Sequence, residues 1–406
     1  MVREASMRFR RGMEMATKPT YSIPSMEEIA ALQWNGYNVV STFSGTGGSC
    51  LGYRMAGFKV LWASEFIPAA QECYRLNHPN SILDTRDIRQ VHPDDILQAI
   101  GLGEGDVDIL DGSPPCASFS TAGKRAAGWG KEKDYSDTKQ RTDDLFFEYA
   151  RLLKGLQPKT FVAENVSGLV KGVAKGYFKL ILQELKACGY QVSAKLLDAQ
   201  WLGVPQMRQR LIFVGVRNDL VERFGVKPLH PSPLPYNYTV RDALPWIVNV
   251  KFSGSSMNYR SSNYASPTIM QTDANRSESA YLSGGGWVEA ETDISRYAIG
   301  KEWDMMGETG ESNSLKYINL KRPRLDSPSY TISQMGGSSS AASVTHPTEK
   351  RKFSIAELKR ISAFPGDFRL TGTYAQQWER IGRAVPPVMM MYIADTVRKD
   401  ILDKCQ

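Results

Sequence analysis

Between residue 38 and about residue 217, short runs of β-branched and other apolar residues alternate with segments of helical periodicity. Such runs form buried strands, which we expect at 38–43, 59–64, 107–111 and 160–163, near Ile82, and as a final pair at 191–197 and 211–216. In the segments between these strands, the spacing of apolar residues predicts helices over 68–77, 93–100, 142–156 and 176–188. This alternation is typical of an α/β fold in which helices cover both faces of a doubly wound, mostly parallel sheet.

The pattern changes after residue 217. The following segment is rich in Ser, Gly, Asn and Tyr and shows little helical period and no simple repeat. Helical periodicity returns at Ser354, which begins a capping box with Glu357, and a last helix is expected from Pro387 to Ile401. The sequence therefore divides into a basic, flexible tail at 1–37, a discontinuous sheet domain at 38–217 and 346–406, and an inserted irregular lobe at 218–345.

Composition restricts the classes of protein to which the chain can belong. Its 406 residues are 42% hydrophobic, which suffices for a large core, and no apolar run is long enough to cross a bilayer. We therefore expect a soluble, cytoplasmic protein. Five scattered cysteines argue against a disulfide framework, and four isolated histidines argue against a zinc site, so no metal is expected. The net charge of +7 favours binding of a polyanion, although it also fits ordinary solubility.

A glycine-rich loop follows the first predicted strand and opens a helix. Its sequence, Phe-Ser-Gly-Thr-Gly-Gly at 43–48, lets backbone amides approach a ligand closely. Glu65 closes the next strand 20 residues after Gly45, where a carboxylate can accept hydrogen bonds from ribose hydroxyls. No Gly-Lys-Ser/Thr follows the loop, which favours a nucleoside without phosphates, and S-adenosylmethionine fits. Asp87, after the third predicted strand, can face the adenine, although its spacing fits a helix cap equally well.

Cys116 follows a predicted buried strand, and Pro114-Pro115 restrict the backbone that enters it. A rigidly held thiol at the carboxyl end of a strand is well placed to act as a nucleophile, although an isolated cysteine is often only a small apolar core residue. Glu164 ends the strand predicted at 160–163, so its carboxyl is expected at the same sheet edge as Cys116. It can act there as a general acid or serve only as an ion-pair partner.

Two groups of basic residues follow. Gln206, Arg208 and Arg210 alternate along the chain and are expected on one face of a strand, beside the thiol or as ordinary surface charges. The run Lys-Arg-Pro-Arg at 321–324 can contact nucleic acid or form a solvated loop.

In type and order, these motifs resemble those of the DNA (cytosine-5)-methyltransferase family. The resemblance covers residues 38 to 398 apart from the irregular lobe, and its Pro-Cys and Glu-Asn-Val motifs are highly specific. It rests on the loop at 43–48, Pro115-Cys116 with Phe119-Ser120, Glu164-Asn165-Val166, Gln206-x-Arg208-x-Arg210, the block 351–365 and the run Ile-Gly-Arg-Ala-Val-Pro-Pro at 381–387. The implied fold is a Rossmann-like class I methyltransferase domain with a target-recognition lobe at 218–345.

The resemblance also implies a mechanism. Cys116 would add to C6 of cytosine, so that C5 becomes nucleophilic and takes the methyl group. Glu164 would contact N3 and the exocyclic amine, Arg210 would contact O2, and Arg208 would support the site or a phosphate. The target base must leave the stack of a specific duplex sequence, and residues 118–142 resemble the family's mobile loop that closes over it. DNA contacts are expected at Ser120, Lys124, Arg125, Gln206, Arg322 and Arg324.

For the cofactor, the resemblance implies S-adenosylmethionine, which leaves as S-adenosylhomocysteine. The residues expected to contact it are Phe43, Gly45, Gly47, Glu65, Phe66, Asp87, Ile88, Leu145 and Val385. Two positions depart from the family's pattern, because Ala117 stands where Gln is usual and Arg383 where Asn is usual. The second departure leaves the cofactor contacts near the last helix open.

Two other functions are disfavoured. Relatives that methylate tRNA carry a Cys-Phe-Thr signature in the recognition lobe, whereas this chain has no cysteine between residues 188 and 405. Unrelated RNA cytosine-5 enzymes use a second cysteine where this chain has Glu164-Asn165. A non-catalytic DNA-binding protein on a decayed scaffold is disfavoured because every chemical residue is present. We expect a monomer that acts on double-stranded DNA, with any restriction endonuclease acting separately.

Overall fold

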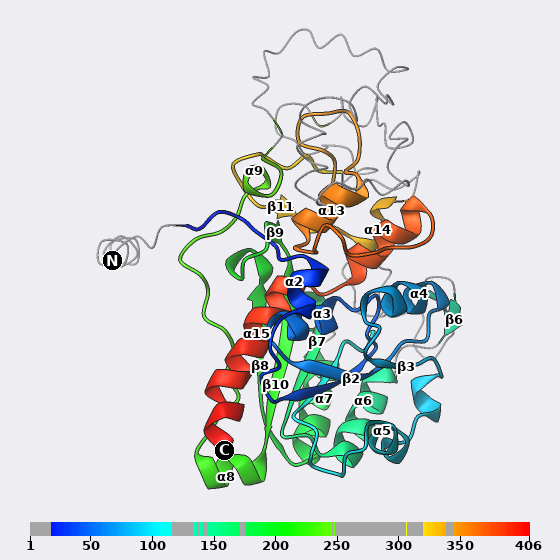
Figure 1. The fold of residues 1–406 in the computed structure, drawn as a ribbon, viewed down its shortest axis with the longest axis vertical. Helices are drawn as coiled ribbons and strands as arrows, with labels where there is room; N and C mark the ends of the chain where they lie inside the picture. Colours follow the sequence, from blue (N-terminus) through cyan, green and yellow to red (C-terminus); the bar gives the residue numbers. More distant parts are fainter. Residues whose placement is uncertain are drawn as a thin grey trace.

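A seven-stranded sheet forms the centre of the molecule in the computed structural model (Figure 1). The structure describes residues 18–115, 133–135, 138–140, 144–170, 175–245, 247, 306, 320–337 and 344–406. Four expected site residues, Cys116, Ser120, Lys124 and Arg125, lie outside the described residues, as does most of the expected loop at 118–142.

The order of strands in the sheet is β3-β2-β1-β4-β7-β10-β8. The first five run parallel, and β10 is antiparallel to both of its neighbours. Their bounds are Asn38–Thr42 (β1), Lys59–Ser64 (β2), Ile82–Asp84 (β3), Ile109–Gly112 (β4), Thr160–Val166 (β7), Tyr190–Asp198 (β8) and Gln209–Arg217 (β10). The expected α/β fold with a mostly parallel sheet is confirmed.

Helices cover both faces of this sheet. One face carries α3 (Gly48–Met55) and α15 (Pro387–Asp400), and the other carries α5 (Pro93–Ile100), α6 (Leu145–Leu156) and α7 (Lys175–Ala187). Two further helices, α4 (Pro68–Asn77) and α8 (Asn218–Phe224), also belong to the sheet domain. Outside the sheet, β5 (Lys133–Tyr135) pairs with β6 (Thr138–Gln140). No helix in the described part of the chain is long and apolar enough to span a membrane.

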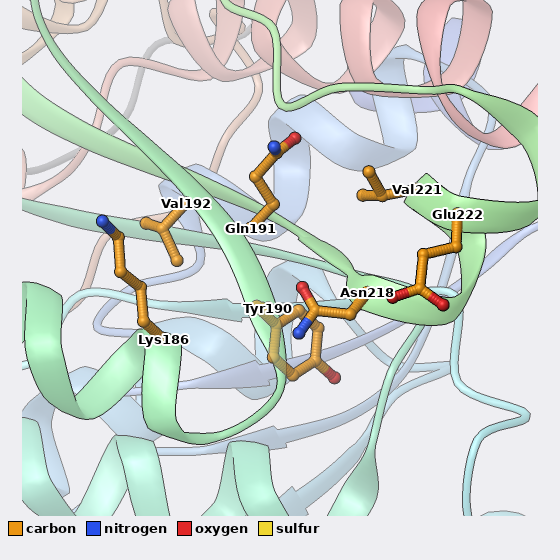
Figure 2. Close-up of a pocket in the computed structure, with 7 residues that line it drawn as sticks. All are labelled: Lys186, Tyr190, Gln191, Val192, Asn218, Val221 and Glu222. Atoms are coloured by element: carbon orange, nitrogen blue, oxygen red, sulfur yellow. The ribbon is translucent and has the colours of Figure 1, made fainter.

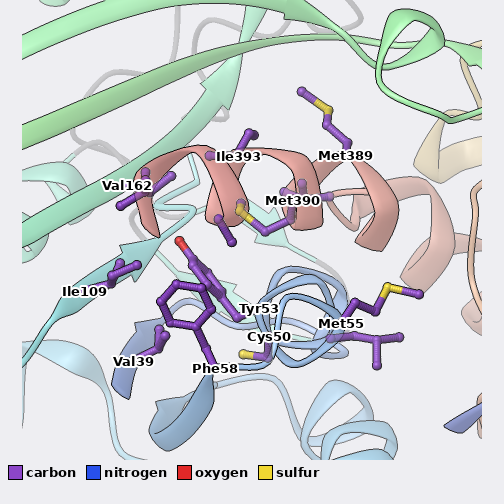
Figure 3. Packing of buried hydrophobic residues seen from close by; sticks show 14 of the residues in the cluster. Val39, Cys50, Tyr53, Met55, Phe58, Ile109, Val162, Met389, Met390 and Ile393 are labelled. Atoms are coloured by element: carbon purple, nitrogen blue, oxygen red, sulfur yellow. The ribbon is translucent and has the colours of Figure 1, made fainter. Parts of the chain in front are cut away.

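The last long helix packs closely on the first helix of the sheet domain. Gly52 permits this approach, because a Cβ at this position would lie 2.5 Å from the carbonyl oxygen of Pro387 and from the Cβ of Met390. Gly48 likewise lies against the carbonyl of Val385. Figure 3 shows the resulting core, in which α15 contributes Met389, Met390 and Ile393, α3 contributes Cys50, Tyr53 and Met55, and the strands contribute Val39, Ile109 and Val162.

A second lobe has its own apolar core. Its elements are α9 (Val240–Ala243), β9 (Gln206–Met207), β11 (Ser329–Tyr330), α13 (Ile355–Ile361) and α14 (Tyr374–Arg383), and Phe353, Leu358 and Trp378 are buried among them. The sequence had suggested that α13 and α14 belong to the sheet domain and α8 to the inserted lobe. Instead, α8 packs on β8 and β10, whereas α13 and α14 lie in the same lobe as α9 (Figure 1). The apolar sides of α13 and α14 are buried there with α9 and residues 334–337.

The expectation of a flexible tail is wrong for residues 18–37. This segment contains α2 (Met26–Ala30), whose N-cap Ser25 forms a capping box with Glu28, and it buries Tyr21 and Ile29. The Tyr21 hydroxyl donates to the carbonyl of Arg360 over 2.7 Å, and Lys18 lies 2.8 Å from Asp242. These contacts with residues far away in the sequence therefore order a segment whose composition alone indicated a flexible tail.

Candidate active site

Three parallel strands, β1, β4 and β7, end at one edge of the sheet and bring predicted motifs together. The parallel register pairs Thr42 of β1 with Gly112 of β4, and Gly112 with Ala163 of β7, so the glycine loop, the Pro114-Pro115 turn and Glu164 all emerge at this edge. The side chain of Asn165 donates a hydrogen bond from Nδ2 to the carbonyl of Pro114 over 3.3 Å. The Glu-Asn-Val motif therefore directly contacts the segment that leads to Cys116.

Glu164 and Arg210 form an ion pair across two strands. Arg210 Nε lies 2.6 Å from Glu164 Oε1, and their side chains are only 14% and 11% exposed. The register explains the contact, since Glu164 is opposite Ile212 and Arg210 is opposite Val166, which places both side chains diagonally on one face. The guanidinium offsets the cost of burying a carboxylate, and the pair presents adjacent hydrogen-bond donors and acceptors at the site.

Arg208 lies deeper and contacts the protein itself. It is 1% exposed, and its two Nη atoms donate to the carbonyls of Ile332, Gly382 and Ala384 at 3.0, 2.8 and 2.9 Å. Burial, reinforced by the nearby charge of Arg210, lowers the pKa of the Arg208 guanidinium well below its ordinary value. Arg208 therefore connects the sheet to the second lobe, and of the two roles that the resemblance implied these contacts favour support of the site over contact with a phosphate.

Gln206 is also buried at the junction between the lobes. Its Oε1 accepts from the amide of Ile332 over 3.1 Å, and its Nε2 donates to Ser362 Oγ over 3.0 Å. Because the residue is 0% exposed, a direct contact with DNA is not available to this side chain in the described conformation. The alternation of polar residues at 206–210 could not reveal this burial, because the residues that contact Gln206, Ile332 and Ser362, lie far away in the sequence.

The glycine loop has the backbone geometry expected of a ligand-binding turn. Gly45 and Gly47 have φ of 58° and 92°, in the left-handed region that favours glycine. Glu65 is buried against this loop and accepts hydrogen bonds from the amides of Gly45 and Ile67, both over 2.7 Å. Burial raises the pKa of the Glu65 carboxyl above its ordinary value, although these amides oppose the effect.

The open side of this loop fits a nucleoside. A Cβ added at Gly45 would have no heavy atom within 4 Å, so space exists directly beside the backbone. The aromatic rings of Phe43 and Phe66 are only partly buried, and Phe66 is 38% exposed. Open space beside the backbone, accessible aromatic side chains and a carboxylate are groups that can bind a nucleoside.

Asp87 belongs to a small charged network beside the loop. It caps a 3-10 turn by accepting from the amide of Arg89, and Arg89 joins Asp87 and Asp144 with contacts of 2.9 and 2.7 Å. Both carboxylate oxygens of Asp87 accept from Arg89, so the structure shows the capping role, and the contact with the adenine stays a prediction. The other expected wall residues, Ile88, Leu145 and Val385, are almost fully buried, at 5%, 3% and 4% exposure.

The remaining basic residues of the prediction lie in the second lobe. Arg324 is exposed and pairs with Asp326 at 2.8 Å, and Arg322 is partly buried. Arg383, which replaces the usual Asn, donates to Glu379 on its own helix over 2.7 Å. Within the described residues, no group of three or more His, Cys, Asp or Glu could hold a metal ion.

Comparison with known proteins identifies the family. The family model of the C-5 cytosine-specific DNA methylase matches residues 37–399. The chain belongs to this family. It is 30% identical over 381 residues to the Type II methyltransferase M.Sau96I of Staphylococcus aureus, covering 93% of this chain and 79% of the relative. It is 27% identical to the Type II methyltransferase M.NgoPII of Neisseria gonorrhoeae, covering 93% and 99%.

Solved structures show the same fold. A DNMT2 mutant of Spodoptera frugiperda superposes with a TM-score of 0.57 at 17% identity, covering 91% of this chain and 99% of that one. Dnmt2 of S. pombe gives a TM-score of 0.56 at 15% identity, covering 89% and 98%. The expected class I methyltransferase fold and membership of the DNA (cytosine-5)-methyltransferase family are therefore confirmed.

One buried carboxyl in this family member was missed by the sequence reasoning. Asp111, the last residue but one of β4, is 2% exposed and accepts hydrogen bonds from Ser41 Oγ, Ser49 Oγ and Tyr53 OH at 2.9, 2.8 and 3.3 Å. The only signal in the sequence was an acidic residue inside an otherwise apolar strand. That signal did not reveal the hydroxyl groups, which come from a strand and a helix more than 50 residues earlier.

A surface hollow of about 540 Å³ lies away from the methylase site (Figure 2). It is lined by Lys186, Tyr190, Gln191, Val192, Asn218, Val221 and Glu222. These residues surround the start of β8 and the end of β10, whereas Arg210 lies near the start of β10 and its partner Glu164 lies in β7. The hollow therefore has no part in the chemistry at the carboxyl edge.

Proposed function

We propose that this protein transfers a methyl group from S-adenosylmethionine to C5 of a flipped-out cytosine in double-stranded DNA, through a covalent bond between Cys116 and C6. The observation that carries the proposal is the convergence at one sheet edge. Glu164 pairs with Arg210 over 2.6 Å, and the next residue, Asn165, hydrogen-bonds Pro114, two residues before Cys116. The glycine loop ends the neighbouring strand in the same register.

Each residue then has a defined task. The thiolate of Cys116 adds to C6, and the electron pair of the C5–C6 bond moves toward C5 and the N3–O2 side of the ring. Glu164 hydrogen-bonds N3 and the exocyclic amine, and Arg210 stabilises the charge that develops at O2. C5 takes the methyl group with release of S-adenosylhomocysteine and then loses its proton to a base or water, and the thiolate leaves as the C5–C6 double bond is restored.

The methyl donor supplies an electrophilic methyl group on a sulfonium. We propose that Glu65 binds its ribose hydroxyls and that the amides of the loop at 43–48 lie along its methionine part. Asp87 and the rings of Phe43 and Phe66 would hold the adenine. The proposal is supported by the open space beside Gly45 and by the burial of the Glu65 carboxyl against the loop.

The biological setting is proposed from the relatives. Both relatives are Type II methyltransferases, so we propose that the enzyme modifies a short specific sequence, with the lobe that contains Arg322 and Arg324 reading the duplex. A monomer suffices for this task, and a cognate endonuclease would act as a separate protein. A cytoplasmic enzyme in contact with the bacterial chromosome is consistent with this setting.

The test of the proposed function uses the nucleophile. Cys116→Ser is expected to bind DNA and cofactor but to transfer no methyl group, and the unaltered enzyme is expected to form a denaturant-resistant adduct with duplex DNA that contains 5-fluorocytosine. Glu164→Gln should reduce kcat by about 10²-fold or more. Cys405→Ser, which alters a cysteine at the far C-terminus, is the matched control and should keep the adduct.

Normal turnover by the Cys116→Ser variant would refute the assignment of the nucleophile. Bisulfite sequencing of DNA from expressing cells would also show the methylated sequence.

A further inference from the structure

Asp111 lies directly beneath the glycine loop at 43–48, which is called the cofactor loop from here on because it is the proposed site of the methyl donor. It is paired in register with Ser41 of β1, so the two side chains are neighbours on the face of the sheet that α3 covers. The loop at 43–48 begins two residues after Ser41 and leads into α3, which carries Ser49 and Tyr53. The three hydroxyl groups that reach Asp111 therefore come from both ends of the loop.

A second layer of hydrogen bonds extends this contact into the loop. Ser44, which is part of the loop, lies 3.0 Å from Ser41 Oγ and 3.2 Å from the Ser41 carbonyl through its own hydroxyl. The hydroxyl of Thr42 donates to the carbonyl of Asp111 over 3.1 Å. An ionised carboxylate accepts all of the hydroxyl groups that reach it, whereas a protonated one must use one oxygen as a donor. The charge state of Asp111 therefore affects how firmly the loop is held.

We propose that Asp111 is a positioning residue for the methyl donor, because its carboxylate holds the cofactor loop in its binding shape through hydroxyl groups on both sides of that loop. The inference rests on the proposed function, since it takes S-adenosylmethionine as the ligand of the loop. Asp111 acts through Ser41, Ser44 and Ser49 and touches no substrate. In the sheet, Asp111 is paired with Val162, two residues before Glu164 in β7, so it lies between the strand that leads into the cofactor loop and the strand of the catalytic motif.

The titration of Asp111 gives this role a signature in pH. Burial raises the pKa of the Asp111 carboxyl to about 7, against the lowering effect of its hydroxyl partners. The other titratable groups that face it are Cys50 and Tyr53 on α3, Tyr149 on α6 and Glu164 on β7. Burial raises the pKa of the Cys50 thiol to about 11 and the pKa of both tyrosines well above their ordinary value, so these three stay neutral through the range in which Asp111 ionises.

The experiment measures binding of S-adenosylhomocysteine to the full-length protein by calorimetry between pH 6 and pH 8.5. In the unaltered protein, the affinity should fall about fivefold to tenfold as the pH is lowered from 8 to 6, because the ionised carboxylate is the form that holds the loop. In Asp111→Asn, the affinity at pH 8 should be about tenfold weaker, and its dependence on pH in this range should disappear. With saturating cofactor, kcat of this variant should stay within about threefold of the unaltered enzyme, so that the loss appears in KM for the methyl donor.

Two further variants separate positioning from stability. Ser41→Ala keeps the carboxylate and its hydrogen bonds from Ser49 and Tyr53 but removes the hydroxyl that links it to Ser44, so it should weaken the dependence on pH. Asp108→Asn is the matched control, because Asp108 is a buried carboxylate at the opposite end of β4 that accepts from the amide of Asn38 over 2.8 Å and from Lys159 over 2.7 Å. It should lower the melting temperature and leave cofactor affinity and its pH profile unchanged.

The possible outcomes are distinct. A pH profile in Asp111→Asn that matches the unaltered protein, or an equal change in Asp108→Asn, would overturn the role of Asp111 and leave the proposed function intact. Should Asp111→Asn fail to fold, the profile of Ser41→Ala decides the same question. If the unaltered protein bound neither S-adenosylhomocysteine nor S-adenosylmethionine at any pH, the proposed methyl donor itself would be refuted.

Discussion

Three buried carboxyl groups lie along one edge of the sheet, and each is stabilised by a different kind of partner. Glu164 has the guanidinium of Arg210, Glu65 has two backbone amides, and Asp111 has three hydroxyl groups. The difference in partners matters because hydroxyl groups offset the cost of burying a charge less than a cation does. For Asp111, burial raises the pKa to about 7 although its three hydroxyl partners lower it.

A second buried titratable group, His78, lies behind the same loop. Its ring stacks on Tyr74 with centroids 4.5 Å apart, and a Cβ at Gly47 would lie 2.1 Å from its Nε2. Burial, together with the charge of Arg54, lowers the pKa of His78 to about 3. The imidazole is therefore neutral at neutral pH and supports the glycine loop by packing.

This pKa predicts how stability depends on pH. The unfolded chain takes up a proton at its ordinary pKa of 6.5, whereas the folded protein does so only near 3, so folding stability is lost as the pH falls below about 6.5. The loss attributable to His78 should be about 2 kcal/mol between pH 7 and pH 5. His78→Asn should remove this part of the slope in denaturant unfolding experiments, after comparison with the unaltered protein at each pH.

The control for that experiment is His92→Asn. His92 is exposed at the N-cap of α5, where Asn is also a good capping residue, so its slope should stay as in the unaltered protein. Asp111 has the opposite effect on folding stability. Its raised pKa makes the folded state bind more protons than the unfolded state between about pH 4 and 7, so its contribution to stability decreases as the pH rises through this range. If His78→Asn kept the full slope, the neutral, buried state of this imidazole would be refuted.

At the scale of elements, the contact between α3 and α15 determines how the two ends of the sheet domain meet. The helices approach closely only because Gly48 and Gly52 present no side chain to the backbone of residues 385–391. The same helix α3 begins at the cofactor loop and carries two of the hydroxyl groups that reach Asp111. Close packing of α15 on α3 therefore also supports the geometry of the cofactor loop.

We predict that Gly52→Ala destabilises the protein. Alanine normally stabilises a helix interior by about 1 kcal/mol relative to glycine. Here, however, the new Cβ would lie 2.5 Å from the Pro387 carbonyl and the Met390 Cβ, so α15 must shift. We expect a net loss of about 1–3 kcal/mol, measured by denaturant unfolding. Gly176→Ala in α7 is the matched control, because its Cβ meets no heavy atom within 4 Å and the change should be neutral or stabilising. A gain in stability at both positions would contradict the close approach.

Local patterns predicted most of the sheet domain because each signal acts within a few residues. The bounds of β2, α4 and α5 match the predicted ranges, since Pro68 and Pro93 start the two helices and Gly101 ends α5. The predicted capping box at Ser354 is present. The burial of Gln206 and Arg208 was not predictable in this way, because their partners at 332, 362 and 382–384 lie more than 120 residues away.

At the scale of the whole molecule, residues 18–30 connect the two lobes. Tyr21 lies in the core of the second lobe, where its ring is 4.8 Å from that of Tyr238 and the guanidinium of Arg360 lies over it at 5.3 Å. A few residues later, α2 packs against α3 of the sheet domain (Figure 1). The amide of Met26, at the start of α2, also donates to the carboxylate of Asp367 over 3.0 Å. This segment therefore holds the lobe that carries Arg322 and Arg324 against the domain that carries Glu164.

We predict that Tyr21→Ala weakens DNA binding more than cofactor binding. Removing a buried aromatic ring at the junction should cost about 3 kcal/mol and loosen the second lobe relative to the sheet domain. The Kd for duplex DNA should therefore rise several-fold, whereas the affinity for S-adenosylhomocysteine, for which the proposed site lies within the sheet domain, should stay within about twofold. Tyr21→Phe, which removes only the hydrogen bond to the Arg360 carbonyl, is the control and should lose about 1 kcal/mol with little effect on DNA binding. If cofactor and DNA affinity fell equally in Tyr21→Ala, the segment would support overall stability rather than the relative placement of the two lobes.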